Sequence, residues 1–277
     1  MNTVSFPGLN LEFTFSKIAF QLFGLPVYKY AVCIVFGIAL SLILMKLSKN
    51  KFGIEYDHVM KCAIWTILFG TIGARIFYVI FNLNYYITNP GSIFLLKQGG
   101  LAIYGGLIAG AITICIYCGK KKLDVLDMFD YVAPFVALTQ CIGRWGNFFN
   151  VEAYGYETRL PWRMGIEVTK YMEVHPVFLY ESILCLALFI FLYIYQSKRK
   201  YKGEIILYYL LGYGVIRFFL EGLRVDSLLF FGQRVSQYIS GALVMLGILY
   251  IYYRKKYIEP KNPKNTANAE STNSVEK

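Results

Sequence analysis

Long apolar runs constrain this chain more than any other feature of its sequence. Seven such runs are each close to the roughly twenty residues that cross a bilayer core as a helix. Apolar side chains lie on all sides of most runs, as lipid-facing helices require, whereas strands of a membrane barrel would alternate in polarity. The sequence therefore predicts an all-α, polytopic membrane protein. The expected spans are residues 30–46, 62–81, 101–118, 130–150, 176–195, 204–222 and 236–253.

The composition excludes other classes of protein. Apolar residues make up 57% of the chain, charged residues make up 16%, and the mean hydropathy is +0.47. A soluble enzyme of 277 residues could not bury so much apolar surface. The small number of charged residues excludes a disordered chain. Glycine does not recur at a regular interval, which excludes a collagen-like chain. The six cysteines fall inside or at the ends of the spans, so no disulfide scaffold, metal site or redox centre is expected.

Basic residues gather in alternate connections between the runs, which predicts that these connections are cytoplasmic. The N-terminus is therefore expected outside and the C-terminus in the cytoplasm. No basic region precedes the first apolar stretch, so a cleaved signal peptide is not expected. The net charge of +11 then reflects topology and attraction to anionic lipid head groups, and no nucleic-acid partner is expected. The basic clusters are Lys46, Lys49, Lys51 and Lys61, then residues 120–122, 198–202 and 254–256.

Three arginines lie within the expected spans: Arg75, Arg144 and Arg217. Each costs on the order of 2.5–3.5 kcal/mol at the centre of a membrane helix, so such residues normally face the bundle interior or a wet cavity. Gly70 and Gly73 precede Arg75 and would let another helix approach closely.

A polar stripe surrounds Arg217. Tyr213, Arg217, Glu221 and Arg224 recur at intervals of four, four and three residues, so they share one helix face. Two interpretations of Arg217 and Glu221 stay open. They form either a structural ion pair that locks helix packing or part of a functional site.

The densest polar segment is CIGRWGNFFNVEAYG, residues 141–155. It places Arg144, Asn147, Asn150 and Glu152 among glycines that weaken a regular helix. Such backbone at membrane depth is tolerated only where it is buried in protein or lines a polar cavity. The alternative is an interface helix held by polar contacts.

Two further segments contain candidate residues. His175 precedes Pro176 at the start of a span, where it acts as a cap or as a catalytic group. The stretch GGLAIYGGLIAG, residues 99–110, lacks the strand context of a dinucleotide-binding loop, so its glycines predict close helix approach around Tyr104.

Outward-facing arginines at membrane depth favour a ligand that is both anionic and apolar, such as a phospholipid. The segment GRWGNFFNVEAYG, residues 143–155, resembles the signature GRxGNFxNxExxG of the phosphatidylglycerol:prolipoprotein diacylglyceryl transferases. The resemblance extends over nearly the whole chain, including the seven spans and their orientation. The other matching positions are Tyr30, Gly73–Arg75, His175–Glu181 and Tyr213–Arg224.

The resemblance implies an enzyme of the bacterial cytoplasmic membrane that catalyses the first step of lipoprotein maturation. It would transfer the diacylglyceryl group of phosphatidylglycerol to the thiol of a lipobox cysteine and release glycerol 1-phosphate. It implies no cofactor and no metal. Residues 1–256 would form one transmembrane catalytic domain, and residues 257–277 a disordered cytoplasmic tail. The alternatives are another membrane phospholipid-processing enzyme and a small-solute transporter, although no internal repeat is evident.

The chemistry requires a cation clamp on the phosphate and help in forming a thiolate from a thiol of pKa about 8.5. Arg144 and Arg217 are expected to form the clamp, and Gly155 to permit a turn. The residues expected to bind or position the head group are Tyr30, Asn147, Glu152 and Tyr213. The residues expected to support them are Arg75, Glu221 and Arg224.

The general base is left open among Glu152, His175 and Tyr104. The family often carries histidine where this chain has Tyr104, and tyrosine, with a pKa near 10, is a poor base at neutral pH. Tyr104 could instead donate a hydrogen bond to the phosphate. A mechanism without a dedicated base also stays open, because neighbouring arginine charges lower the pKa of a thiol. The sequence departs from the family again at Val225 and Asp226, where proline and aspartate are common.

Overall fold

The computed structural model describes residues 2–48, 51–95, 99–169, 172–225, 229–230, 233–253 and 256, so the expected tail lies outside the described residues. The chain divides into two compact units. The first comprises Met1–Ile38, Val136–Ile194 and Leu207–Lys277, and the second Ala39–Phe135 and Tyr195–Ile206. A single catalytic domain over residues 1–256 stays a prediction.

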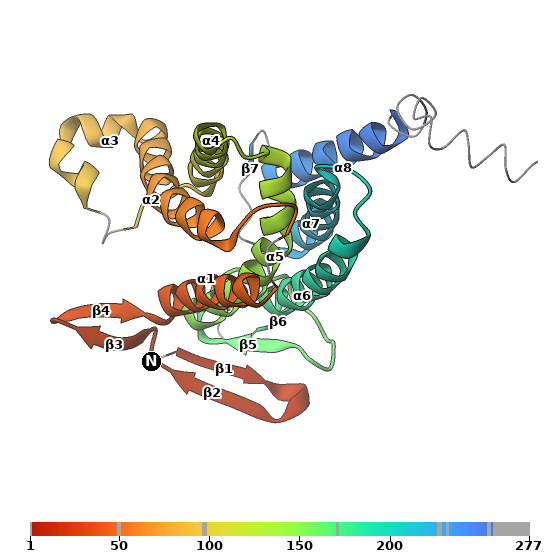
Figure 1. Ribbon diagram of the computed structural model, residues 1–277. Coiled ribbons are helices and arrows are strands. Elements are labelled where there is room, and N and C mark those ends of the chain that lie inside the picture. Colours follow the sequence, from red (N-terminus) through yellow and green to blue (C-terminus); the bar gives the residue numbers. More distant parts are fainter. Residues whose placement is uncertain are drawn as a thin grey trace, which may run out of the picture. The chain divides into compact units, whose positions relative to one another are not determined.

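Seven helices in the described residues are long and apolar enough to cross a membrane, which confirms the expected helical class (Figure 1). Two of them, α2 and α5, begin several residues before the expected spans, and each carries one acidic residue in its first turn, Asp57 in α2 and Asp127 in α5. Asp124 caps α5 by accepting hydrogen bonds from the amides of Leu126 and Asp127 at 2.9 and 3.1 Å. The seven are α1 (Lys29–Leu47), α2 (Tyr56–Phe81), α4 (Ile103–Lys121), α5 (Val125–Asn150), α6 (Val177–Tyr195), α7 (Glu204–Leu223) and α8 (Val235–Tyr253).

Short strands accompany the helices and were not predicted from the sequence. A four-stranded antiparallel sheet in the order β2-β1-β5-β6 joins the N-terminal hairpin to the segment between α5 and α6 (Figure 1). Its core includes Val4 and Ile166, and it packs on Phe148 at the end of α5 and Phe178 at the start of α6. The sheet therefore fixes these two helix ends. Its strands are β1 (Asn2–Phe6), β2 (Leu11–Phe15), β5 (Met164–Ile166) and β6 (Glu173–Val174).

The remaining elements are short. Two further hairpins pair β3 (Ile18–Leu22) with β4 (Leu25–Tyr28), and β7 (Leu229–Phe230) with β8 (Gln233–Arg234). One more α-helix, α3 (Leu83–Thr88), follows α2. The 3-10 helices among the described residues are η1 (Pro7–Leu9), η2 (Pro90–Phe94), η4 (Glu167–Thr169) and η5 (Gln196–Lys198).

In the second unit, α2 and α4 pack closely where both carry small residues. A Cβ atom on Gly105 would lie 2.5 Å from the carbonyl oxygen of Gly73, and one on Gly73 would lie 2.9 Å from that of Gly105. Any side chain at either position would force the helices apart. The close approach predicted from the glycines of both segments is therefore confirmed.

Arg75 organises the connection between α2 and α4. It is 8% exposed, and its five N–H groups, the full capacity of a guanidinium, donate to five backbone carbonyls at 2.7–3.4 Å. The left-handed backbone of Gly99 and Gly100, with φ of 83° and 82°, aims two of these carbonyls at Nη1. Arg75 thus stabilises the backbone of the connection between α2 and α4. The five carbonyls belong to Ser92, Ile93, Leu95, Gly99 and Gly100.

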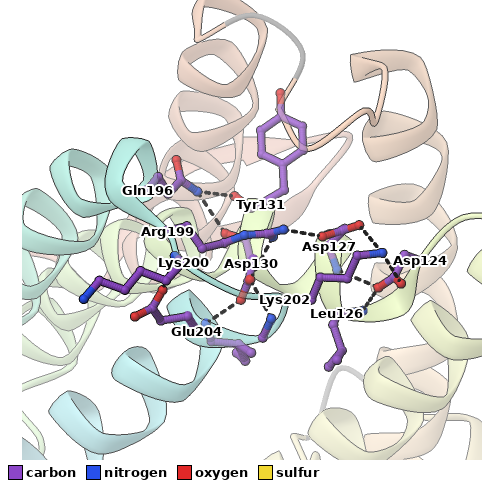
Figure 2. A network of polar contacts seen from close by, with 12 residues as sticks. Asp124, Leu126, Asp127, Asp130, Tyr131, Gln196, Arg199, Lys200, Lys202 and Glu204 are labelled. Carbon is purple, nitrogen blue, oxygen red and sulfur yellow. Dashed lines mark hydrogen bonds and ion pairs between the residues drawn. The ribbon is translucent and has the colours of Figure 1, made fainter. Parts of the chain in front are cut away.

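A buried ionic network ties the start of α5 to the segment that leads into α7, as Figure 2 shows. Arg199 donates to Asp127 at 2.7 Å and to Asp130 at 2.9 Å. Lys202 extends the network outward, with Nζ at 2.7 Å from Asp124 and 3.2 Å from Asp127. Outside the spans, the Lys202 ammonium holds the pKa of the Asp124 carboxyl below its ordinary value.

Asp130 is the centre of this network and is fully buried. Besides Arg199, its carboxylate accepts hydrogen bonds from the amides of Gly203 at 2.7 Å and Ile206 at 2.9 Å, at the start of α7. The side chain of Gln196 also donates to the backbone carbonyl of Asp130, at 2.9 Å. Together these four contacts fix the start of α5 against the segment that leads into α7.

Asp130→Asn is expected to destabilise the protein by on the order of 3 kcal/mol, because it removes the charge opposite a buried guanidinium while keeping the side-chain shape. Thermal unfolding in detergent measures the loss. Asp124→Asn is the matched control, because its partner Lys202 is 54% exposed and solvent screens that pair. Equal shifts of the unfolding temperature in the two variants would contradict the central role of Asp130.

Candidate functional site

Three helices of the first unit bring polar residues to one place. Consecutive helices run in opposite directions, so the C-terminal ends of α5 and α7 and the N-terminal end of α6 meet. Arg144 comes from α5, Glu181 from α6, and Tyr213 and Arg217 from α7. The structure thereby brings the polar segment of residues 141–155 beside the polar stripe on α7. The sequence alone could not establish that these two segments are neighbours.

Glu181 is the centre of this cluster. One of its oxygens, Oε1, lies 2.7 Å from Nη2 of Arg144 and accepts a hydrogen bond from the Tyr213 hydroxyl at 3.1 Å. The other, Oε2, lies 3.5 Å from Nη1 of Arg217. The Glu181 side chain is 1% exposed. A single buried carboxylate therefore holds both arginines in place.

The second carboxylate is Glu221, one turn beyond Arg217 on α7. Its Oε2 lies 2.5 Å from Nη2 of Arg217, so the predicted ion pair is present. Arg234 donates to the backbone carbonyl of Glu221 at 2.6 Å. The carboxylates are buried, whereas the side chains of Arg144 and Arg217 keep 18% and 17% of their surface exposed. An anionic ligand can therefore reach the guanidinium groups, and the glutamates orient them from behind.

The polar segment after Arg144 forms its own hydrogen-bonded chain. Asn147 Oδ1 accepts from Arg144 at 3.5 Å, and Asn147 Nδ2 donates to Glu152 Oε1 at 2.8 Å, where Asn150 also donates at 3.3 Å. Val151, with φ of 55°, ends α5 in the left-handed conformation, which a β-branched residue rarely adopts. This sharp turn brings Glu152 back over the helix end.

Tyr30 lies directly against this part of α5. A Cβ atom on Gly146 would lie 2.7 Å from Cδ2 of Tyr30, so only glycine permits the contact. The Tyr30 hydroxyl group lies close enough to Arg144 and Glu152 to interact electrostatically with both. The structure thus brings four predicted residues together around the end of α5: Tyr30, Arg144, Asn147 and Glu152.

Gly155 is required because two chain segments approach it. Its amide donates to the His175 carbonyl at 3.0 Å, and it pairs with Arg224 in an isolated antiparallel bridge. An added Cβ would lie 2.7 Å from the His175 Cβ and 2.9 Å from the Leu223 carbonyl oxygen. Gly155 therefore holds the end of α7, and with it Arg224, beside the segment that follows α5.

His175 lies in this backbone junction. Its Nδ1 is 3.2 Å from the hydroxyl of Tyr180, which also accepts a hydrogen bond from Trp162 at 2.7 Å. Burial lowers the pKa of His175, so the imidazole is neutral at pH 7. In the described part of the chain, its ring makes no hydrogen bond with Arg144, Arg217 or Glu181. These contacts favour a structural role over that of a general base.

Tyr104 and Arg75 belong to the second compact unit. Tyr104 is half-buried at the second residue of α4. The start of α4 is held by a hydrogen bond from the Ala102 amide to the Ala74 carbonyl at 3.0 Å, next to the Arg75 contacts. The catalytic role of Tyr104 stays a prediction.

Sequence reasoning assigned no role to Glu181 or Arg234. A glutamate in an otherwise apolar span is a signal for Glu181, because a buried carboxylate needs a partner. Arg234 joins the end of α7 to the segment after α5, since it also donates to the Tyr156 hydroxyl at 2.7 Å. No comparable signal exists for Arg234, which lies in a connection.

Comparison with known proteins places the chain in a family. Residues 17–253 match the family model described as prolipoprotein diacylglyceryl transferase, and this range contains every residue of the site above. The chain belongs to the prolipoprotein diacylglyceryl transferase family. The resemblance found in the sequence motifs is therefore confirmed.

Several curated relatives are named phosphatidylglycerol–prolipoprotein diacylglyceryl transferase. The protein from Finegoldia magna is 43% identical over 246 residues, which cover 88% of this chain and 98% of the relative. That from Clostridioides difficile is 42% identical over 241 residues, 87% of this chain and 96% of the relative. A Streptococcus pneumoniae protein is 41% identical over 250 residues, 88% of this chain and 95% of the relative.

Proposed function

We propose that this member of the diacylglyceryl transferase family transfers the diacylglyceryl group of phosphatidylglycerol to the thiol of a prolipoprotein lipobox cysteine. The reaction is the first step of lipoprotein maturation and releases glycerol 1-phosphate. The observation that carries the proposal is the pair of partly exposed arginines, Arg144 and Arg217, held by the buried Glu181 at the ends of three membrane helices. The names of relatives that are 41–43% identical over most of the chain support it.

The proposed location is the bacterial cytoplasmic membrane, with the N-terminus outside. The lysine-rich connections at residues 120–122 and 198–202 adjoin the start of α5, the end of α6 and the start of α7. The arginine cluster lies at the opposite ends of the same three helices. The positive-inside rule therefore puts the cluster at the outer surface, where an exported prolipoprotein presents its cysteine.

The two guanidinium groups would bind the phosphodiester oxygens, while the apolar helices accommodate the acyl chains. The thiolate attacks the glyceryl carbon that bears the phosphate, a carbon–sulfur bond forms, and the carbon–oxygen bond to the phosphate breaks. The departing glycerol phosphate takes the electron pair, and Arg144 and Arg217 neutralise its growing charge. Asn147, Glu152 and Tyr30 would position the head group beside Arg144.

The origin of the thiolate separates two mechanisms. A dedicated base, Glu152 or Tyr104, would take the thiol proton; alternatively, the arginine charges would lower the pKa of the thiol enough for solvent to take it. The contacts of His175 favour a structural role, so it is the weakest of the three candidates. Tyr104 is the most informative residue to test, because histidine often stands there in the family.

Tyr104→Phe is expected to lower the transfer rate by about tenfold to a hundredfold, because it removes one hydrogen-bond donor, without moving the pH optimum. Tyr104→His, which retains a donor, is expected to remain active. pH–rate profiles of the three proteins with one lipobox peptide measure both effects. If Phe abolished turnover and His moved the rising limb to lower pH, Tyr104 would be the base instead.

The function itself is tested with purified protein in detergent, radiolabelled phosphatidylglycerol and a lipobox peptide. We expect the label on the peptide, and no label on a matched peptide with serine in place of the cysteine. Labelled free diacylglycerol in both reactions would identify a phospholipid-cleaving enzyme. No lipid turnover by folded protein would favour a transporter.

A further inference from the structure

An apolar groove runs along the surface of the second unit, between α2 and α4. Its volume is about 630 Å³. The groove shares no residue with the arginine cluster, which belongs to the first unit. Its principal apolar lining residues are Trp65, Phe69 and Ile76 on α2, and Ala109, Ile112 and Ile116 on α4.

The groove follows from the packing of the helix pair. Small residues such as Gly73 and Ala109 bring the two backbones together and form its floor, while larger side chains flank it. Trp65 is 48% exposed and Ile112 is 53% exposed, so the described residues leave the groove open to the surroundings. In a membrane protein, these surroundings are lipid.

One end of the groove is cationic. Of the described residues that line it, Lys120 alone is charged, and it lies in the last turn of α4. Beside it, the hydroxyl of Tyr117 lies 3.2 Å from Nδ1 of His58, which adds polar groups at the same end. Lys120 is exposed, whereas the nearby charge of Lys61 is paired with Asp57 at 2.5 Å.

The dimensions of the groove match one leaflet of a bilayer. From Ala109 to Lys120 the lining extends along roughly 16 Å of helix. Half of the bilayer hydrocarbon core is about 15 Å thick. The groove is therefore about as long as one acyl chain in a leaflet, and Lys120 lies at the end that would be at the membrane surface.

We propose that this groove binds an anionic phospholipid of the cytoplasmic leaflet, with an acyl chain along the groove and its phosphate at Lys120. The inference goes beyond the transferase reaction, because the donor lipid of that reaction is expected at the opposite surface. Charge excludes two other occupants. The basic start of a signal peptide would meet like charge at residues 120–122, and so would the same cluster of a second copy.

Trp65 supplies a direct reporter of this site. The chain has three tryptophans, so Trp145→Phe combined with Trp162→Phe leaves Trp65 as the sole indole in the groove. This variant is reconstituted in phosphatidylcholine vesicles. Phosphatidylserine or phosphatidylcholine with brominated acyl chains is then added at equal mole fractions, and quenching of Trp65 fluorescence reports which lipid occupies the groove.

We expect brominated phosphatidylserine to occupy the site about fivefold more strongly than brominated phosphatidylcholine, as one lysine at an anionic head group provides. Lys120→Gln is expected to bring this ratio close to one. Lys121→Gln is the matched control, because it removes the same charge one residue further along the same helix but does not line the groove. The ratio should persist in that variant.

Two results would overturn the proposal. Equal quenching by the two lipids in the protein with Lys120 would show that the groove does not select the head group. Equal loss of selectivity in the Lys120 and Lys121 variants would show diffuse attraction to the basic surface rather than a site. Because the readout is fluorescence and not transfer, neither result depends on the proposed reaction.

Discussion

Glu181→Gln is expected to lower kcat/KM for diacylglyceryl transfer by at least about a hundredfold. Glutamine keeps the shape of the side chain but removes the charge 2.7 Å from Arg144 and 3.5 Å from Arg217. Two partly buried guanidinium groups would then repel each other, and Arg144 would lose the anion that orients it. Initial rates over a titration of phosphatidylglycerol measure the loss.

Two companion variants separate the charge of Glu181 from its hydrogen bonding. Glu181→Asp retains the charge on a shorter side chain and should recover part of the activity. Tyr213→Phe removes the hydrogen bond to Oε1 at 3.1 Å and should cost only about tenfold. Size-exclusion chromatography in detergent establishes that each variant is folded. Rates close to those of the unsubstituted protein in folded Glu181→Gln would remove Glu181 from the site.

The membrane helices could be predicted because their signal is local. An apolar run of the right length is sufficient, and all seven expected spans coincide with helices. The starts of α2 and α5 were missed because acidic residues, Asp57 in α2 and Asp127 in α5, interrupt the apolar pattern there. The four-stranded sheet was missed because its strands are short and depend on distant partners, such as Val4 beside Ile166. No local pattern encodes that pairing.

The site shows the same division between local and distant information. The contact of Arg217 with Glu221 follows from their spacing on one helix. The contacts of Glu181 with Arg144 and Arg217 join three helices, and spacing within one helix cannot indicate them. Arg75 is a second example, because its partners are backbone carbonyls, which leave no trace in the amino-acid sequence.

The charged residues near the two ends of α5 differ in burial and in their partners. Near its start, Asp130 is fully buried and accepts hydrogen bonds from the amides of Gly203, just before α7, and Ile206, within its first turn. At its end, Arg144 remains partly exposed beside residues of α6 and α7. We therefore expect the start of α5, where the chain itself pairs the buried charge of Asp130, to contribute mainly to stability. The end of α5, where Arg144 keeps accessible surface, is expected to contribute mainly to binding. This contrast predicts which conservative substitutions affect activity without affecting folding.

Arg144→Lys is expected to abolish most transfer, by about a hundredfold or more, although the positive charge is retained. The guanidinium contacts Asn147 at 3.5 Å, the Tyr213 hydroxyl at 3.4 Å and Glu181 at 2.7 Å, and the Arg144 side chain stays 18% exposed. A single lysine ammonium, which lacks the planar guanidinium fork, cannot make these contacts and also bind two phosphate oxygens. If the clamp acts mainly on the departing phosphate, kcat should fall more than KM rises.

The matched control for Arg144→Lys is Arg163→Lys, the same substitution in a residue that pairs with Glu173 at 2.5 Å in the connection between α5 and α6. Arg163 lies outside the cluster, so this variant should transfer normally. Arg217→Lys should resemble Arg144→Lys, because Arg217 contacts the carboxylates of Glu181 and Glu221 while 17% of its side chain stays exposed. Normal turnover by folded Arg144→Lys would show that a point charge suffices at this position. It would contradict bidentate binding of the phosphate by Arg144.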